Sequence, residues 1–388
     1  MNRYIVKTSS RKINKTNFVF FIFTPIGAIL ATVWLYAAGL VRWQDWVLAV
    51  GFMLLTGFSI TAGYHRLFSH KSYKAAWIIK FLFVLFGSAA YEGSVLEWCT
   101  DHRNHHRYTD TDRDPYDIKK GFWFAHIGWI FTLDQSTRNF SNVEDLLADS
   151  LLRWQHRYNF SIAAVMGFIL PTIVGGLWGS WLGGLIIAGA LRVSVNQHLT
   201  FCINSVCHLF GKRTYSNTQS ARDNWIVALF TYGEGYHNFH HQFPIDYRNG
   251  IRFYQFDPTK WLIKLLFYLK LTNDLNIVSE HRIIRYRFQN EEKLLLAKMA
   301  KLQSACSEHM YSVVTTVRVG INHVLKQIDR LEKEYLSLRK AKINEYRLEK
   351  QCRDRLNAAN KELKQYMFLW TRLVGKGNHL SVPSAIEA

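Results

Sequence analysis

The sequence predicts an all-α membrane protein with four transmembrane helices, a cytosolic helical cap holding a histidine-rich dimetal site, and a C-terminal helical extension. The first observation is a set of long apolar runs in a chain of 388 residues that is 49% hydrophobic and 15% aromatic. The second is the recurrence of histidines at ligand spacing beside those runs. The third is a proline-free stretch rich in Lys, Glu, Arg and Leu that follows them.

The first two spans are expected at residues 18–40 and 46–64, because both runs are uncharged and long enough to cross a bilayer. Only residues 41–45 lie between them, which predicts a hairpin. The preceding residues 1–17 are polar and basic, and they lack the small-residue cleavage site of a secretory signal peptide. We therefore expect a basic cytosolic N-terminus.

Two further spans are expected at residues 160–178, broken by Pro171, and at residues 181–201. They form a second hairpin. Residues 75–91 are apolar but shorter and carry Lys80, which favours a helix lying in the membrane interface or against the bundle over another full span.

The distribution of charge predicts the orientation. Lys and Arg crowd the N-terminus, the loop after the second span and the C-terminal part, whereas the two hairpin tips together offer only Arg42. The positive-inside rule then places both termini and every histidine motif in the cytosol. The formal charge of +19 indicates a membrane surface and no nucleic-acid partner, because the basic residues flank apolar runs. The five cysteines show no CxxC spacing, which indicates free thiols.

Four histidine motifs are the candidates for chemistry. An HxxxxH begins at His65, HxxHH occurs at His102 and again at His237, and an NxxxH joins Asn204 to His208. Positions i, i+3 and i+4 share one face of a helix, and imidazole suits iron, copper, zinc and nickel. Nine imidazoles are too many for one ion but suit two, with four or five for each. The candidate ligands are His65, His70, His102, His105, His106, His208, His237, His240 and His241, with Asn204 or water completing the coordination.

Two carboxylates beside these motifs, Asp101 and Glu234, are candidates for accepting imidazole N–H groups, which would fix the tautomers of the ligands. The alternative for each is a helix N-terminal carboxylate or a surface ion pair. The other histidines have no such neighbours, and we expect them to be structural: His126, His156, His198, His281, His309, His323 and His379.

Several ordered segments carry a resemblance to a known family. They are GYHRLFSH at 63–70, EWCTDHRNHH at 97–106, DRDP at 112–115, GFWF at 121–124, NSVCH at 204–208 and GEGYHNFHH at 233–241. In order and spacing they resemble the membrane-bound fatty acyl desaturases, and within them the stearoyl-CoA (delta-9) desaturase group, over about residues 18–270. The stretch YRNGIRFYQFDP at 247–258 resembles bacterial members more than animal ones.

The resemblance implies two Fe²⁺ ions held by the nine histidines, with Asn204 contacting a metal through water. It implies that dioxygen is consumed and that a cis double bond, at delta-9, enters a saturated acyl chain carried by coenzyme A or a lipid. A kinked tunnel leads that chain to the metals. The membrane would be the bacterial inner membrane or the endoplasmic reticulum.

Electrons are expected from a separate donor, such as cytochrome b5 or ferredoxin with its reductase. The reason is that the chain shows no HPGG haem signature, no GxGxxG after a strand and no cysteine cluster.

Departures from the family pattern concern the acyl carrier. Thr100 stands where animal members tend to carry an arginine, and the residues FTLD at 131–134 replace basic residues. The basic residues that remain as candidate phosphate contacts are Arg103, Arg107, Lys119 and Lys120.

Two other functions remain open at this point. A di-iron fatty acyl or alkane hydroxylase would use the same ligands, although NSxxH and the residues around both HxxHH motifs favour a desaturase. A non-enzymatic metal transporter would need polar ligands within the spans, whereas these histidines lie at their cytosolic ends.

The last part of the chain is predicted to be helical. Within residues 276–374, seven apolar residues recur at alternating steps of four and three: Val317, Ile321, Val324, Ile328, Leu331, Tyr335 and Leu338. This pattern predicts a coiled coil or helical hairpin that self-associates, docks on the cap, binds a partner or packs only on itself. The expected organisation is therefore 1–17, 18–275, 276–374 and a flexible tail at 375–388.

Overall fold

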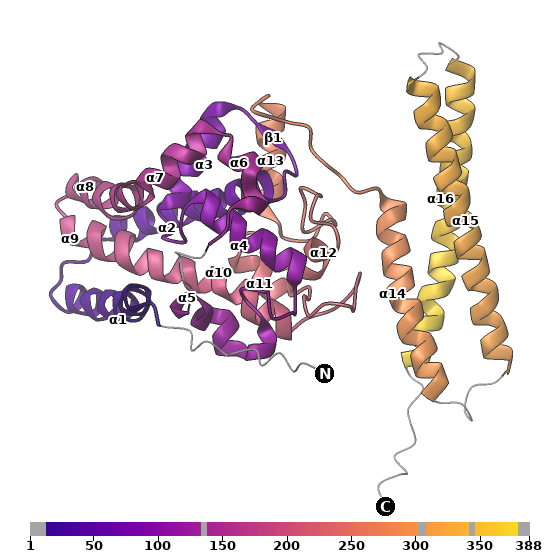
Figure 1. The fold of residues 1–388 in the computed structure, drawn as a ribbon, viewed down its shortest axis with the longest axis horizontal. Helices are drawn as coiled ribbons and strands as arrows, with labels where there is room; N and C mark the ends of the chain where they lie inside the picture. The colour runs from indigo at the N-terminus through magenta and orange to yellow at the C-terminus, as the bar shows by residue number, and fades with distance from the viewer. Residues whose placement is uncertain (1–12, 133–137, 302–307, 341–345, 379–388) are drawn as a thin grey trace, which may run out of the picture. The chain divides into compact units, whose positions relative to one another are not determined.

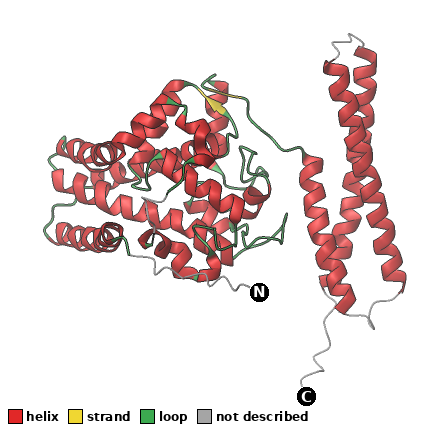
Figure 2. Cartoon of the chain, in the orientation of Figure 1, coloured by secondary structure: helices red, strands yellow, loops and turns green. Residues whose placement is uncertain are grey.

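The structure is a computed structural model that describes residues 13–132, 138–301, 308–340 and 346–378. These residues are almost entirely helical (Figures 1 and 2). The chain forms two compact units, one of Met1–Arg213 with Asn217–Ile277 and one of Thr214–Ser216 with Val278–Ala388. The predictions for residues 1–12, for residues 133 and 134 and for the tail from 379 onward lie outside the described residues.

Four helices in the first unit are long and apolar enough to span a membrane, as predicted: Lys15–Ala37, Trp43–Ser69, Ser150–Gly176 and Trp181–Leu209. The first is α1. The second joins α2 (Trp43–Phe58) to the π-helical segment η1 (Ser59–Ser69). The third joins α7 (Ser150–Ala164), the π-helical η6 (Val165–Ile169) and α8 (Leu170–Gly176). The fourth joins α9 (Trp181–Gly183), the π-helical η7 (Gly184–Leu191) and α10 (Arg192–Leu209), and it packs against the other three.

The third span differs from the prediction in two ways. It begins at Ser150, where the side chain of Asp149 accepts a hydrogen bond from the backbone N–H of Leu151, ten residues before the apolar run. It also continues through Pro171 instead of breaking there. The wide turn of η6 comes directly before this proline, and such a turn accommodates the missing N–H and the bulk of the ring.

The second and fourth spans run past the ends of their apolar sequences, to Ser69 and to Leu209. These extensions carry His65 and His208, so both histidines lie on helices that continue directly from the membrane spans. Hydropathy alone could not predict them, since the extra turns are polar and buried against the rest of the first unit.

The tips of the two hairpins meet at Asp45, whose side chain is fully buried. Its carboxylate accepts hydrogen bonds from Nε1 of Trp178, Oγ of Ser180 and the backbone N–H of Arg42, each at 2.9 Å. The two hairpins are therefore joined at the end of the bundle opposite the histidines.

Shorter helices complete the first unit. The apolar α3 (Trp77–Ser88), predicted to lie in the interface or against the bundle, packs against α2, η1 and α7. Helix α4 (Val95–Tyr108) begins with a capping box in which Ser94 and Glu97 each bond the other's backbone N–H. The remaining elements are η2 (Ile118–Lys120), η3 (Phe124–Gly128), α5 (Trp129–Phe131), η5 (Ser141–Val143), α6 (Glu144–Leu147), α11 (Trp225–Phe230), α12 (His237–Gln242), α13 (Pro258–Tyr268) and the antiparallel pair β1 (Lys74–Ala75) and β2 (Thr272–Asn273).

The second unit consists of α14 (Glu280–Lys301), α15 (Glu308–Lys340) and α16 (Tyr346–Asn378), with α15 and α16 side by side (Figure 1). Its core contains the whole predicted apolar stripe, from Val317 to Leu338, packed against residues of α14 and α16 that include Phe288 and Trp370. The stripe thus packs on helices of its own chain.

Candidate metal centre

The structure brings all nine predicted histidines together from four segments of the chain. His65 and His70 come from the end of the second span, His208 from the end of the fourth, and the two HxxHH motifs from α4 and α12. The histidines form two groups. The first is His65, His70, His102, His106 and His240, and the second is His105, His208, His237 and His241.

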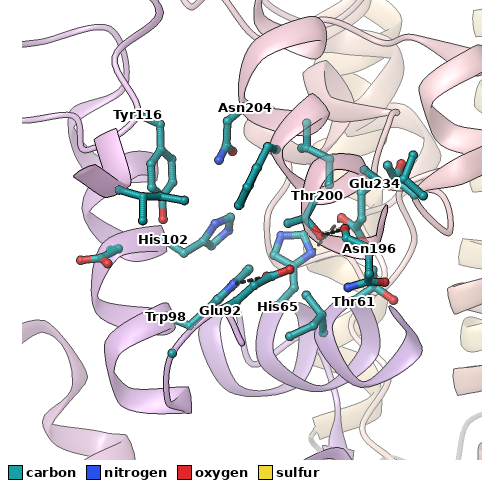
Figure 3. Close-up of a pocket in the computed structure, with 18 of the residues that line it drawn as sticks. Thr61, His65, Glu92, Trp98, His102, Tyr116, Asn196, Thr200, Asn204 and Glu234 are labelled. Atoms are coloured by element: carbon teal, nitrogen blue, oxygen red, sulfur yellow. Dashed lines mark hydrogen bonds and ion pairs between the residues drawn. The ribbon is translucent and has the colours of Figure 1, made fainter. Parts of the chain in front are cut away.

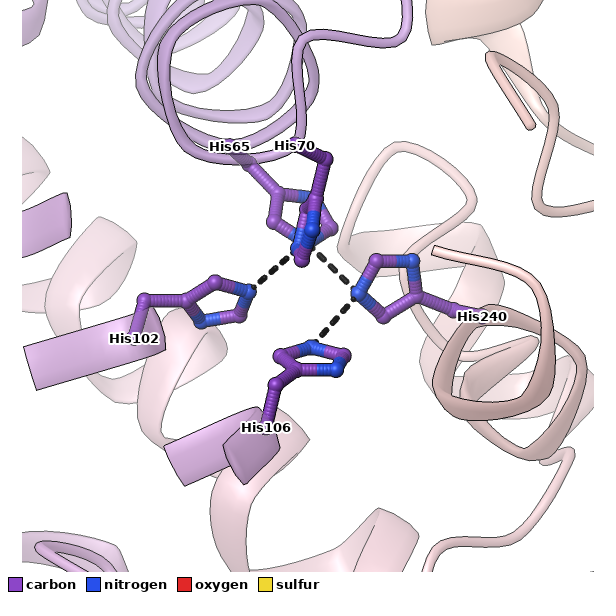
Figure 4. A group of neighbouring side chains, drawn as sticks. All are labelled: His65, His70, His102, His106 and His240. Atoms are coloured by element: carbon purple, nitrogen blue, oxygen red, sulfur yellow. Dashed lines mark hydrogen bonds between the residues drawn. The ribbon is translucent and has the colours of Figure 1, made fainter. Parts of the chain in front are cut away.

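In the first group the ligand nitrogens all lie within 4.8 Å of one another (Figure 4). Nε2 of His240 is 2.9 Å from Nε2 of His65 and 2.9 Å from Nε2 of His106. Nε2 of His70 is 2.8 Å from Nε2 of His102. Nitrogen ligands about 2.1 Å from one ion and at right angles lie about 3 Å apart, so this spacing suits an ion at the centre of the group.

The second group has the same compactness. Nε2 of His241 lies 3.0 Å from that of His237 and 3.2 Å from that of His105, and Nε2 of His208 lies 3.1 Å from that of His237. Residues of α4 and α12 contribute to both groups, because adjacent histidines in each HxxHH motif point to different groups.

The surroundings favour the neutral form of six of these imidazoles, which is the form that metal ligation requires. Burial, and after it the charge of neighbouring groups, lowers the pKa well below its ordinary value for His70, His102, His106, His237, His240 and His241. A cationic metal bound to such neutral nitrogens would keep its full positive charge. The donor set, its spacing and its protonation state therefore all fit a pair of transition-metal ions.

In each of the two histidine groups, one carboxylate contacts the Nδ1 atom of a histidine. Nδ1 of His65 lies 2.8 Å from Glu234, and Nδ1 of His105 lies 2.8 Å from Asp114, with all four side chains buried. Burial would raise the pKa of each carboxyl, but the histidine and the other partners outweigh it, and both pKa values are lowered. Each carboxylate can thus accept an N–H at Nδ1 and leave Nε2 free for a metal.

Two neutral side chains contact the Nδ1 atoms of two further histidines in the second group. Nδ1 of His208 lies 2.6 Å from Oγ of Ser220, which also donates to Asp110, and Nδ1 of His241 lies 3.1 Å from Oε1 of Gln219. The sequence analysis did not identify Asp114, Ser220 or Gln219. Asp114 lies in the DRDP motif, which was a signal for it; nothing in the sequence pointed to the other two.

Glu234, the partner of His65, also contacts a buried arginine. Arg66 donates to Glu234 at 2.9 Å, to Asp257 at 3.0 Å and to the backbone oxygen of Tyr247 at 2.8 Å. Asn249 donates to the other oxygen of Glu234 at 2.7 Å. The segment that follows α12 is thereby tied to the histidine-bearing end of the second span.

Glu234 takes the predicted role, although toward His65 and not toward the nearby His237. Asp101 does not take it: its carboxylate accepts from Nη2 of Arg138 at 2.7 Å, and Arg138 also pairs with Glu97 at 3.0 Å. Burial raises the pKa of Asp101 to about 6, and Arg138 opposes that shift. The arginine lies 37 positions away in sequence, so adjacency to His102 was misleading.

A cavity of about 150 Å³ lies against the histidines (Figure 3). His65, His102 and His237 line it, and so does Asn204, the tenth predicted site residue. Its lining includes Glu97 and Asp101 of α4, together with Tyr116 and Arg138. It also includes Gly57, Ile60 and Thr61 of the second span, Asn196 of the fourth span, and Tyr232.

Glu92, Trp98 and Thr200 also line the cavity (Figure 3). Nε1 of Trp98 donates to Glu92 at 3.2 Å. Burial raises the pKa of Glu92 to about 7, and hydrogen bonds with Thr200 and Trp98 oppose the shift. The sequence analysis did not single out Glu92.

Four of the histidines expected to be structural have partners that fit that role. His126 contacts Ser205 at 3.0 Å and His198 at 3.1 Å, and His156 contacts Ser94 at 2.7 Å. His281 contacts Glu332 at 3.1 Å, and His323 is exposed on α15. The predictions for the side chains of His309 and His379 lie outside the described residues.

Comparisons with known proteins match this part of the chain. Residues 41–271 match the sequence profile of the family described as fatty acid desaturase, and all ten predicted site residues lie within them. The chain is 45% identical over 258 residues to a probable acyl-CoA desaturase of Schizosaccharomyces pombe, an alignment that covers 66% of this chain and 54% of that protein. It is 44% identical over 256 residues to acyl-CoA desaturase 1 of Saccharomyces cerevisiae, covering 66% and 50%.

An animal relative is similar over a shorter stretch. The chain is 40% identical over 237 residues to stearoyl-CoA desaturase 5 of Bos taurus, covering 59% of this chain and 70% of that one. The chain spans about half the length of the two fungal relatives that it matches.

Proposed function

The chain belongs to the fatty acid desaturase family, and from this premise we propose that it is an oxygen-dependent fatty acyl desaturase. It would insert a cis double bond, at delta-9, into a saturated acyl chain carried by coenzyme A or by a lipid. The observation that carries the proposal is the pair of histidine groups lying directly against a cavity that extends into the membrane bundle.

The proposed cofactor is a pair of iron ions, one held by His65, His70, His102, His106 and His240 and the other by His105, His208, His237 and His241. Asn204 would contact a metal through water. Iron, unlike redox-inert zinc, supplies activation of dioxygen, which removal of hydrogen from unactivated methylenes requires.

The proposed reaction consumes dioxygen, electrons and protons, and it needs a site from which bulk water is kept away. Two adjacent methylenes lose two hydrogens and become a double bond, while dioxygen takes up these hydrogens, two electrons and two protons to give two waters. The buried side chains around the cavity keep bulk water away from the reacting carbons. Trp98 and Thr200 would position the acyl chain beside His65 and His102.

The two electrons are proposed to come from a separate protein, such as cytochrome b5 or ferredoxin with its reductase. We propose that the site and both termini face the cytosol, because the hairpin tips at the opposite end of the bundle carry only one basic residue, Arg42. The membrane would be the bacterial inner membrane or the endoplasmic reticulum. The second unit, with its α15–α16 pair, is the candidate for self-association.

Expression in a desaturase-deficient host tests the proposal. We expect new cis-monounsaturated fatty acids with the parent chain and with His323→Ala, which removes a histidine of the second unit, outside the proposed site. We expect none with His105→Ala, which removes a ligand of the second group. Hydroxylated acyl products would contradict desaturation and assign the chain to the hydroxylases.

Iron content separates loss of the metal from loss of the fold. The purified parent and His323→Ala proteins are expected to hold two irons per chain, and His105→Ala fewer. A full iron complement and full desaturation in His105→Ala would remove this histidine from the proposed site.

A further inference from the structure

The second unit neutralises most of its acidic side chains with partners of its own. Glu334 of α15 lies 3.7 Å from Arg355 of α16. Ion pairs of the same kind occupy five further carboxylates: Asp329 with Arg285, Glu332 with His281, Glu291 with Arg287, Glu292 with Arg318, and Glu349 with Arg353. Basic residues elsewhere on these helices therefore have few carboxylates left to compensate their charge.

One face of α16 collects such basic residues. The exposed residues that form this basic face, none of which has an ion-pair partner in the described part of the chain, are Arg347, Lys350, Lys361, Lys364 and Arg372. At 100° per residue they fall within an arc of about 100° around the helix axis. The opposite side of the helix is packed in the core of the unit through Cys352, Ala359, Leu363 and Trp370.

The basic face also exposes an aromatic ring. Phe368 lies within the same arc and is 63% exposed, and the guanidinium carbon of Arg372 is 5.6 Å from the centroid of its ring. Leu369 beside it is 46% exposed. Asp354 is the one acidic residue that the described part of α16 places in this arc. Uncompensated positive charge thus surrounds a large apolar side chain that is open to solvent.

The shape and the location of the basic face favour a lipid surface over a soluble acidic protein. The basic residues are spread over 25 positions of one helix, which is about 40 Å, and an extended anionic plane can contact all of them. Only residues 274–279 lie between β2 of the first unit, which carries the candidate membrane spans, and α14. A lipid surface is therefore present at high local concentration, whereas a soluble partner loses translational freedom on binding.

We propose that the basic face of α16 binds the anionic headgroups of a phospholipid membrane, with Phe368 entering the headgroup region. Each Lys or Arg beside such a surface raises the binding constant roughly five-fold. The match to the desaturase family ends at residue 271, so this role belongs to a part of the chain outside that family's profile. It is also independent of the proposed desaturase function.

Footprinting of the full-length protein tests the inference. The protein is placed in lipid discs of phosphatidylcholine alone or of phosphatidylcholine with phosphatidylserine, and oxidation by hydroxyl radicals is read by mass spectrometry at Phe368. Tyr311, which is 38% exposed on α15, is the internal reference. Oxidation of Phe368 relative to Tyr311 should be roughly five-fold lower or less in the anionic discs. Molar salt should restore it, because the Debye length falls from about 10 Å to about 3 Å.

Variants of the basic face should move this protection in both directions. The triple variant Lys350→Gln, Lys361→Gln and Lys364→Gln should lose it, because its binding constant falls roughly 100-fold. Asp354→Asn removes the acidic residue of the face and should keep Phe368 protected at higher salt than the parent. All four positions are exposed, so the variants are expected to fold, and their melting temperatures check this.

A second triple variant is the matched control. Lys326→Gln, Arg330→Gln and Lys333→Gln remove the same charge from exposed positions of α15, and Phe368 should stay protected. Equal oxidation of Phe368 in neutral and anionic discs would overturn the inference, and so would equal loss of protection in the two triple variants. The readout needs no desaturase activity, so failure of the proposed function leaves the test intact.

Discussion

At the scale of single residues, the carboxylate of Asp114 would orient one proposed metal ligand, because it lies 2.8 Å from Nδ1 of His105 and both side chains are almost fully buried. Asp114→Ala leaves that nitrogen unpaired and the ring free to turn. We expect iron affinity to fall roughly 10- to 100-fold, measured by competition with a chelator. Asp112→Ala, at an exposed position two residues away, should bind iron as the parent does. Equal affinities in all three proteins would show that Asp114 does not orient the ligand.

Glu92 makes stability depend on pH. Its pKa is about 7 in the folded protein and about 4.5 unfolded, so the folded state binds the proton more tightly between these values. The contribution of this group to stability therefore falls as pH rises from about 4.5 to about 7 and is constant above that. The loss is at most roughly 3 kcal/mol, at 1.36 kcal/mol for each pKa unit.

Glu92→Gln removes this titration and keeps the side chain's size. The melting temperature of the parent relative to Glu92→Gln should decline between about pH 4.5 and pH 7 in detergent solution and then level off. A difference that stays constant across this range would show that Glu92 is ionised equally in both states.

Contacts between single residues could be predicted only where their spacing in the sequence places them close together. The HxxHH spacing places three rings on one helical face, and all nine predicted histidines do come together. Ser220 and Gln219 meet His208 and His241 only after folding, through a loop without a recognisable pattern. Asp101 was a candidate for accepting an imidazole N–H, with a helix N-terminal carboxylate or a surface ion pair as the alternative, and the structure pairs this buried carboxylate with the guanidinium of Arg138.

At the scale of elements, the α15–α16 pair depends on Gly320. A Cβ atom at this position would overlap the ring of Tyr366 on α16. Gly320→Ala raises helix propensity but forces the two helices apart, and overpacking of this kind costs about 1–3 kcal/mol. We expect faster hydrogen exchange along α15 and α16 in the full-length protein.

Gly375→Ala is the matched substitution on α16, because nothing lies within 4 Å of a Cβ atom there. Helix propensity then acts alone, and exchange should stay the same or slow slightly. If the two alanine variants behave alike, contact with Tyr366 is not what selects glycine at position 320.

The presence of the apolar helices follows closely from hydropathy, but the residues at which they begin and end do not. The two hairpins and the short apolar helix at Trp77–Ser88 were predictable because apolar length alone decides them. The early start at Ser150 depends on the cap that Asp149 supplies, and continuation through Pro171 depends on the wide turn of η6. Both are local backbone effects that a hydropathy pattern does not contain.

At the scale of the whole molecule, the metals should stabilise the first unit. They would connect the ends of the second and fourth spans to α4 and α12, segments that the chain supplies separately. A ligand at 100 times its dissociation constant stabilises the folded state by about 2.7 kcal/mol. Removing iron with a chelator should therefore lower the melting temperature, and adding Fe²⁺ back should restore it.

His105→Ala provides the comparison, since its melting temperature should respond less to the chelator than that of His323→Ala. If the parent melts at the same temperature with and without iron, the histidine groups are held by the protein alone.

The order in which the chain supplies the histidines has a consequence for biosynthesis. The first group contains His65 and His240, and the second contains His105 and His241, so each combines an early segment with the last one. On a growing chain neither group is complete until α12 has left the ribosome, by which time all four spans have been made. With the proposed iron ions, loading would therefore be a maturation step that follows translation of the bundle, and a chain stalled before residue 240 would lack a complete set of the proposed ligands for either ion.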